Sequence, residues 1–172
     1  MLYTRRGDDG TTKTFGCDQR ISKSSAIAEA LGSLDEINSF LGLCKVKAKD
    51  KGSTFLKIQD RTLEDIIHNI QKNLFIIQAE LAGSPMSITE EKVKELEVMV
   101  DATEKELPPI KTFFISGGTE LASLFDIART IARRAERRVV NVTEPASSAD
   151  KEEKIVVNKF TLAYLNRLSS VL

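Results

Sequence analysis

The chain has 172 residues, enough for one domain with its own hydrophobic core, and 41% of them are hydrophobic while 29% are charged. Lys and Arg number 25 together and so do Asp and Glu, and this zero formal charge argues against a nucleic-acid-binding protein, which would carry a basic excess. Two cysteines are too few for a disulfide framework, and the sequence has no apolar run typical of a signal peptide or a membrane span. We therefore expect a soluble cytoplasmic protein.

Residues 4–23 are rich in Gly, Thr, Asp and basic side chains and have almost no apolar ones, which predicts a loop. Behind it, apolar residues recur at helical spacing between Gly, Ser and Pro breaks, and they predict helices over 24–49, 55–81, 89–107, 120–142 and 152–172. A short apolar segment at 110–118 is strand-like, and Thr119 is the expected N-cap of the fourth helix. The pattern predicts an all-α fold, a five-helix antiparallel bundle, in one domain formed by a loop at 1–23 and a helical bundle at 24–172.

The loop contains Thr4-Arg5-Arg6-Gly7-Asp8-Asp9-Gly10-Thr11-Thr12-Lys13, a composition that suits phosphate binding. The glycines let the backbone turn tightly and present N–H groups to an anion, and the Thr, Arg and Lys side chains add donors. Asp8 or Asp9 is suited to hold a metal ion through water, as Mg²⁺ prefers. No Gly-Lys-Ser/Thr follows, so this is not a Walker loop. A disordered polar tail is the alternative interpretation.

The fourth predicted helix carries Arg129-Thr130-Ile131-Ala132-Arg133-Arg134-Ala135-Glu136-Arg137-Arg138. At about 100° per residue, Arg129, Arg133 and Glu136 fall on one face. A row of guanidinium groups interrupted by one carboxylate suits a polyphosphate with a polar group beside it. A solvated charged face with internal ion pairs is the alternative.

Three further features bear on function. Asp35 lies near the edge of the apolar stripe of the first helix, so we expect it to pair with an Arg of another helix or subunit. Phe113 and Phe114 precede the fourth helix and either seal the bundle or line a pocket for a large apolar ligand. His68 is the only histidine, which argues against a zinc site, and the sequence offers no activated nucleophile.

These segments occur together, in this order, in the PduO-type ATP:cob(I)alamin adenosyltransferases, and the sequence resembles that family over almost the whole chain. The resemblance is carried by the segments 4–10, 20–23, 34–39, 117–123, 128–138 and 164–169. Each motif is modest alone, but six in register make a specific match.

The resemblance implies a five-helix bundle that assembles as a homotrimer with active sites at the subunit interfaces. It implies transfer of the 5′-deoxyadenosyl group of ATP to the cobalt of cob(I)alamin, giving adenosylcobalamin and triphosphate, with Mg²⁺ on the phosphates. The absence of a protein nucleophile then has a reason, because cobalt(I) attacks the ribose 5′ carbon itself. The candidate partners are a flavin-type reductase and adenosylcobalamin-dependent enzymes, with no nucleic acid and no membrane.

The family's ATP site corresponds to Thr4, Arg5, Arg6, Gly7, Thr12, Lys13, Lys23, Arg133, Arg134, Glu136, Arg137 and Asn166. In this assignment Lys23, Arg133 and Mg²⁺ hold the triphosphate, and Glu136 and Asn166 orient the nucleotide. Phe113 lies beside the lower face of the corrinoid and excludes the lower axial ligand of cobalt(II). Asp35 and Arg129 form a pair between subunits.

The sequence departs from the family pattern on the corrinoid side more than on the ATP side. Ser116 stands where Pro is frequent, Asp126 where His is common, and Ser170 where Asp is frequent. Ile27 stands where the family often has an Arg after the Lys23 segment, and the family's last helix usually continues past the position of Leu172. These departures leave the preferred corrinoid open. They also leave open a regulatory bundle that binds ATP without corrinoid chemistry, while a helical nucleic-acid binder using the Arg row is disfavoured by the zero net charge.

Overall fold

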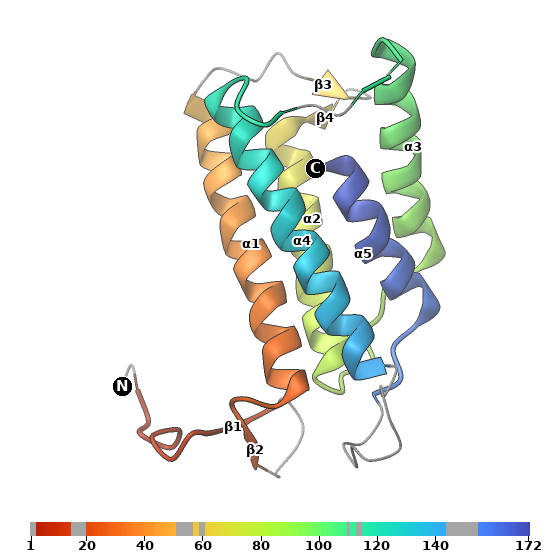
Figure 1. Ribbon diagram of the computed structural model, residues 1–172. Coiled ribbons are helices and arrows are strands. Elements are labelled where there is room, and N and C mark those ends of the chain that lie inside the picture. The colour runs from red at the N-terminus through yellow and green to blue at the C-terminus, as the bar shows by residue number, and fades with distance from the viewer. Residues whose placement is uncertain are drawn as a thin grey trace.

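The computed structural model describes residues 3–14, 20–50, 57–58, 61–109, 111–112, 115–143 and 155–172, which form an elongated helical bundle (Figure 1). The five helices of this described part are α1 (Ala26–Asp50), α2 (Leu63–Leu81), α3 (Glu90–Glu106), α4 (Glu120–Thr143) and α5 (Lys159–Val171). Two antiparallel hairpins pair β1 (Thr11–Lys13) with β2 (Arg20–Ser22) and β3 (Lys57–Ile58) with β4 (Arg61–Thr62). The predicted helical fold class is confirmed.

Two of the helices begin later than hydrophobic periodicity predicts, because a capping residue decides the start. The helix expected from 55 begins at Leu63, where Thr62 has an extended backbone and its Oγ1 accepts the Asp65 N–H at 3.1 Å. The helix expected from 152 begins at Lys159, where the Asn158 side chain accepts the Phe160 N–H at 3.0 Å. The described residues of each predicted extension are strand or irregular.

The strand-like segment expected at 110–118 contains no strand in its described residues, 111–112 and 115–118. Ile115 is 98% exposed, so this apolar residue has no neighbouring sheet to cover it. Gly117 has a φ of 115°, a backbone conformation in which glycine is favoured. Thr119 then starts α4 as expected, since its Oγ1 accepts the Ala122 N–H at 3.2 Å.

The helices pack mainly against antiparallel neighbours, but α3 and α5 run in the same direction. α1 packs against α2 and α4, while α5 lies between α4 and α3 (Figure 1). The C-terminal residues Leu107 and Leu172 line the same cavity, which places the ends of α3 and α5 together. Successive helices alternate in direction, as the predicted antiparallel bundle requires (Figure 1). Odd-numbered helices share one direction in an alternating bundle, so direct packing of α3 on α5 makes a parallel contact.

The core is aliphatic and lies along the bundle axis, as the scarcity of aromatic residues requires. Residues that are fully buried include Leu34, Ile37, Leu41, Leu74, Ile77, Ala135, Val139, Leu165 and Leu168. Tyr164 is the largest fully buried side chain, and its hydroxyl accepts a hydrogen bond from Asn73 Nδ2 at 3.1 Å. Lys92 Nζ donates to Asn73 Oδ1 at 2.6 Å, so one polar network joins α2, α3 and α5. Along the described part of the chain, every helix falls short of the length and apolarity that a membrane crossing needs.

Candidate active site

The N-terminal arm, residues 3–14, folds into a turn. Lys23, the residue that follows β2, binds this turn through two hydrogen bonds. Lys23 Nζ donates to the Gly7 carbonyl at 2.7 Å, and the Lys23 N–H donates to the Gly10 carbonyl at 2.9 Å. Gly10 has a φ of 77°, and a Cβ on Gly7 would lie 3.0 Å from Lys23 Nζ and 3.1 Å from the Thr11 carbonyl oxygen. The turn therefore uses both glycines of the motif, one for its conformation and one for its lack of a side chain.

Asp9 and Arg20 close the other side of this turn. Asp9 Oδ1 accepts the Thr11 N–H at 3.0 Å and the Thr11 hydroxyl at 2.7 Å, and Arg20 Nη2 lies 3.5 Å away. The hydrogen bonds from Thr11, aided by the Arg20 charge, hold the pKa of Asp9 below its usual value. Asp9 Oδ1 therefore helps to hold the turn, and a metal-ligand role for Asp8 or Asp9 stays a prediction. Within the described ranges, no cluster of three His, Cys, Asp or Glu side chains could hold a metal ion.

Sequence reasoning assigned no role to Arg20, although it lies in a segment that matches the family. Its Nε donates to Thr11 Oγ1 at 2.5 Å and its Nη2 donates to the Thr11 carbonyl at 3.0 Å and to the Arg6 carbonyl. The β1–β2 register pairs Arg20 with Lys13, at the end of the strand that follows the turn. Apart from its place in the matching segment 20–23, Arg20 is only a basic residue before an apolar one, and this local pattern is too weak to predict its bonds to the turn.

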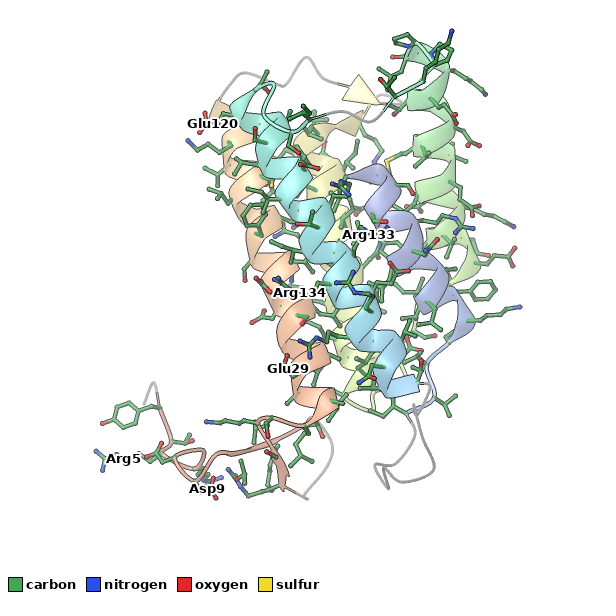
Figure 2. All side chains as sticks on the ribbon, in the orientation of Figure 1. Arg5, Asp9, Glu29, Glu120, Arg133 and Arg134 are labelled. Carbon is green, nitrogen blue, oxygen red and sulfur yellow. The ribbon has the colours of Figure 1, made fainter. Side chains whose placement is uncertain are left out.

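The arm and the Arg row of α4 stand apart within one chain. Figure 2 places Arg5 and Asp9 on the arm beyond the N-terminal end of α1, while Arg133 lies about midway along α4. Five predicted ATP ligands of this region are exposed, namely Thr4, Arg5, Arg6, Lys13 and Lys23, whereas Gly7 and Thr12 are half-buried. A single chain therefore brings the arm ligands together with one another but not with Arg133.

The Arg row itself divides into two groups. Arg134 Nη2 lies 2.5 Å from Glu36 Oε2 and Arg138 Nη1 lies 3.2 Å from Glu29 Oε2, so these two guanidinium groups tie α4 to α1. For them the interpretation as internal ion pairs applies, although Arg134 was also predicted to bind ATP. Arg133 and Arg137 are exposed on α4.

Glu136 and Asn166, predicted from segments far apart in the sequence, meet across the α4–α5 contact. Asn166 Nδ2 donates to Glu136 Oε1 at 2.9 Å. Arg133 lies three residues before Glu136, one turn along the same helix. The three side chains together offer a cation, a carboxylate and an amide, which suit the phosphate, hydroxyl and base groups of a nucleotide.

Arg129 is paired within its own helix, through residues that depart from the family pattern. Arg129 Nη2 donates to Asp126 Oδ1 at 2.6 Å and Nε donates to the same oxygen at 3.0 Å. The other oxygen of Asp126 accepts a hydrogen bond from the Ser116 hydroxyl. These bonds, first that from Ser116 and then that from Arg129, hold the pKa of Asp126 below its usual value. Ser116, Asp126 and Arg129 thus form one hydrogen-bonded group.

Asp35 is exposed in a hollow of about 370 Å³ between α1 and α2. Lys45, His68 and Lys72 also line this hollow. Asn38 lies beneath it, 5% exposed, and its buried Oδ1 has no hydrogen-bond partner in the part of the chain that the structure describes. Asp35 shares this hollow with residues of α1 and α2, whereas Arg129 lies on α4, and the predicted pair between them stays a prediction.

Phe113 and Phe114 lie outside the described residues, but Pro108 and Pro109, a few residues before them, border a large apolar cavity. This cavity has a volume of about 650 Å³ and is lined by Leu63, Ile66, Ile67, Ile70, Met99, Val100, Thr103, Glu104, Leu107, Pro108, Pro109, Phe125, Ser170, Val171 and Leu172. The sequence did not predict this cavity, because each of the apolar residues that line it could equally belong to a packed core. Ser170, one of the departures, lies on its wall.

Comparison with known proteins identifies the family to which the chain belongs. The family model described as Cobalamin adenosyltransferase matches residues 2–172. The chain is 38% identical over 178 residues to the corrinoid adenosyltransferase PduO of Citrobacter freundii, with 99% of this chain and 47% of that protein covered. It is 40% identical over 172 residues to the corrinoid adenosyltransferase of Bacillus subtilis, with 98% and 80% covered. The chain thus spans about half the length of the PduO relatives that it matches.

Solved structures give the same result. A phenylalanine-to-histidine variant of the PduO-type ATP:corrinoid adenosyltransferase from Lactobacillus reuteri, complexed with cobalamin and ATP, superposes with a TM-score of 0.81 at 30% identity, covering 99% of this chain and 86% of that one. An arginine-to-lysine variant from the same organism, complexed with ATP, also gives 0.81, at 32% identity and with 99% and 89% covered. The family model and the solved structures cover nearly the whole chain, and the chain belongs to the cobalamin adenosyltransferase family.

Proposed function

We propose that this protein transfers the 5′-deoxyadenosyl group of ATP to the cobalt of cob(I)alamin, giving adenosylcobalamin and triphosphate. The observation that carries the proposal is the 2.9 Å contact between Glu136 and Asn166, one helical turn from the exposed Arg133. The names of the relatives, and the solved neighbours that hold cobalamin and ATP, support the same reaction.

In this reaction the electron pair of cobalt(I) forms a bond to the ribose 5′ carbon. The bond between that carbon and the 5′ oxygen breaks, and triphosphate leaves with its electron pair. The protein then has no proton to abstract and no nucleophile to supply. Its work is to align the two reactants and to stabilise the charge that grows on the leaving group.

The described residues divide this work between phosphate and nucleoside. Arg133 and Lys23 would hold the triphosphate, with the arm residues 4–7 and 12–13 adding hydrogen-bond donors. Mg²⁺ would arrive on the ATP phosphates, because Mg²⁺ usually binds through substrate phosphates and keeps several waters. Glu136 and Asn166 would orient the adenosine.

A homotrimer would bring the separated halves of the site together. The arm and Arg133 stand apart in one chain (Figure 2), so the arm of one subunit would close on the Arg row of a neighbour. Asp35 would then receive Arg129 of that neighbour, because a guanidinium has five N–H donors and can keep its bonds to Asp126. Sedimentation velocity at micromolar concentration measures this assembly, and a monomer would contradict it.

The corrinoid would approach from the end of the bundle that holds the apolar cavity. The cavity adjoins Pro108 and Pro109, which lead into the segment of Phe113. Apolar walls exclude water from a cobalt face, and Phe113 beside that face would keep the lower axial ligand away. Ser170 on the cavity wall is the position most suited to alter corrinoid preference.

The test is an absorbance assay with ATP, Mg²⁺ and chemically reduced cobalamin, in which the reductant stands in for a cytoplasmic flavin-type reductase. We expect the adenosylcobalamin spectrum to appear with one triphosphate for each product formed. Calorimetric titration with ATP, run in parallel, identifies the alternative. ATP binding without product would favour a regulatory nucleotide-binding bundle.

A further inference from the structure

A chain of hydrogen bonds crosses the bundle from α3 through α5 to α4. Arg167 Nε donates to Glu97 Oε1 at 3.1 Å, and Arg167 Nη1 donates to Asn166 Oδ1 at 2.8 Å. Asn166 Nδ2 in turn donates to Glu136 Oε1 at 2.9 Å. The chain starts on α3, a helix to which the sequence assigned no functional residue, and ends at the nucleotide-binding carboxylate of the proposed function.

The chemistry of the two outer groups fixes which way the Asn166 amide faces. A guanidinium carries only donors, so the atom facing Arg167 must be the amide oxygen. A carboxylate only accepts, so the atom facing Glu136 must be the amide nitrogen. Rotating the amide by half a turn would place donor against donor and acceptor against acceptor. The network therefore selects one of two amide orientations.

Arg167 alone cannot maintain this selection, because it follows Asn166 on the helix and its long side chain has many rotamers. Glu97 supplies the second anchor, from a different helix. The two side chains are 42% and 41% exposed, and exposed ion pairs contribute little to folding. The pair is thus better suited to orienting its neighbour than to stabilising the bundle.

We infer that Glu97 is a positioning residue for the nucleotide: it holds Arg167, which fixes the Asn166 amide in the orientation that serves Glu136 and ATP. The inference rests on the proposed function and deepens it. Glu97 itself touches no substrate. Removing it should weaken ATP binding and leave the KM for the corrinoid unchanged, because only the nucleotide side depends on this amide.

A double-mutant cycle on the full chain tests the route through Asn166, with ATP affinity measured by calorimetry and therefore without turnover. We expect Glu97→Ala to weaken ATP binding about two- to tenfold, the range for one hydrogen bond. In the Asn166→Ala background the same change should add nothing, because the amide on which it acts is gone. Glu97→Gln keeps an acceptor oxygen for Arg167 and should bind ATP within about twofold of the wild type.

Asp101→Ala is the matched control, since Asp101 is an exposed acid one turn further along α3 and should have no effect. Circular dichroism and thermal unfolding check that each variant keeps the fold. Equal losses from Glu97→Ala in both backgrounds, or an equal loss from Asp101→Ala, would overturn the positioning role alone. A wild-type protein that binds no ATP would refute the proposed function and this inference with it.

Discussion

The arm and the α4–α5 contact carry the same kinds of side chain, but they hold them in different ways. The turn of the arm lies outside the core, and the Lys23 and Arg20 side chains donate hydrogen bonds to its backbone carbonyls. At the α4–α5 contact, Glu136 and Asn166 follow directly on Ala135 and Leu165, which are fully buried. Segments with few buried contacts open at low free-energy cost, whereas groups on packed helices stay in place. The helices are therefore suited to the chemical step and the arm to closing over the nucleotide.

The largest effect should come from the helical half of the site. We expect Arg133→Ala to lose about 2–4 kcal/mol of transition-state stabilisation, as for the loss of one preorganised donor. Because Arg133 is exposed, the fold should persist. The measurement is kcat/KM for adenosylcobalamin formation. Arg138→Ala is the control, because the Arg138 guanidinium forms an ion pair with Glu29 of α1. Equal kcat/KM values in both variants would show that Arg133 has no specific role in the reaction.

The second largest effect should be on thermal stability, which we expect to depend on the helical core and not on the arm. Tyr164→Phe removes the acceptor of Asn73 Nδ2 in the core, and an unsatisfied buried donor costs about 1–3 kcal/mol. For a chain of this length each kcal/mol lowers Tm by about 2–4 °C. The matched change in the arm is Tyr3→Phe, which removes an exposed hydroxyl that accepts from Arg5. Thermal unfolding should show a lower Tm only for the first variant, and an equal loss in Tyr3→Phe would mean that the arm belongs to the cooperative core.

A change in the arm should alter ATP binding although it does not alter thermal stability. Gly7→Ala places a Cβ about where Lys23 Nζ and the Thr11 carbonyl oxygen now approach, at 3.0 and 3.1 Å, so the lysine must move away. We expect the KM for ATP to rise about tenfold, the cost of a charge-assisted hydrogen bond, with an unchanged Tm. Gly32→Ala, where a Cβ on α1 meets nothing within 4 Å, is the control and should leave KM unaltered. An unchanged KM in both variants would show that the turn geometry is irrelevant to ATP.

The sequence predicted the helices well because periodic burial depends on local spacing. Leu34, Ile37 and Leu41 occupy one face of α1, as their positions require. The errors arose where a single hydrogen bond decides the start of a helix. α2 begins at Leu63, eight residues after the predicted start at 55, because the Thr62 hydroxyl accepts the Asp65 N–H. Periodicity carries no information about which polar residue will cap.

The site was predictable in its residue types and unpredictable in its pairings. Arg133, Glu136 and Asn166 could be selected because their chemistry suits a nucleotide and their motifs match the family. The partners Glu97 and Arg167 are 70 residues apart, and only the packing of α3 against α5 brings them together. Ser116 and Asp126 looked like independent departures until the fold placed the hydroxyl on the carboxylate.

The smallest effect concerns two carboxyl groups, one in each region, whose pKa values are lowered by different hydroxyl groups. Thr11 lowers the pKa of Asp9 in the arm, and Ser116 followed by Arg129 lowers that of Asp126 on α4, both from a usual 3.8. A lowered folded-state pKa contributes stability above the unfolded value, and this contribution disappears as the pH falls through the folded pKa. Carboxyl NMR titration should show that Ser116→Ala moves Asp126 toward 3.8 without moving Asp9. Thr11→Val should do the reverse, and because the two sites share no partner, movement of both groups in either variant would mean that arm and helix are coupled within one chain.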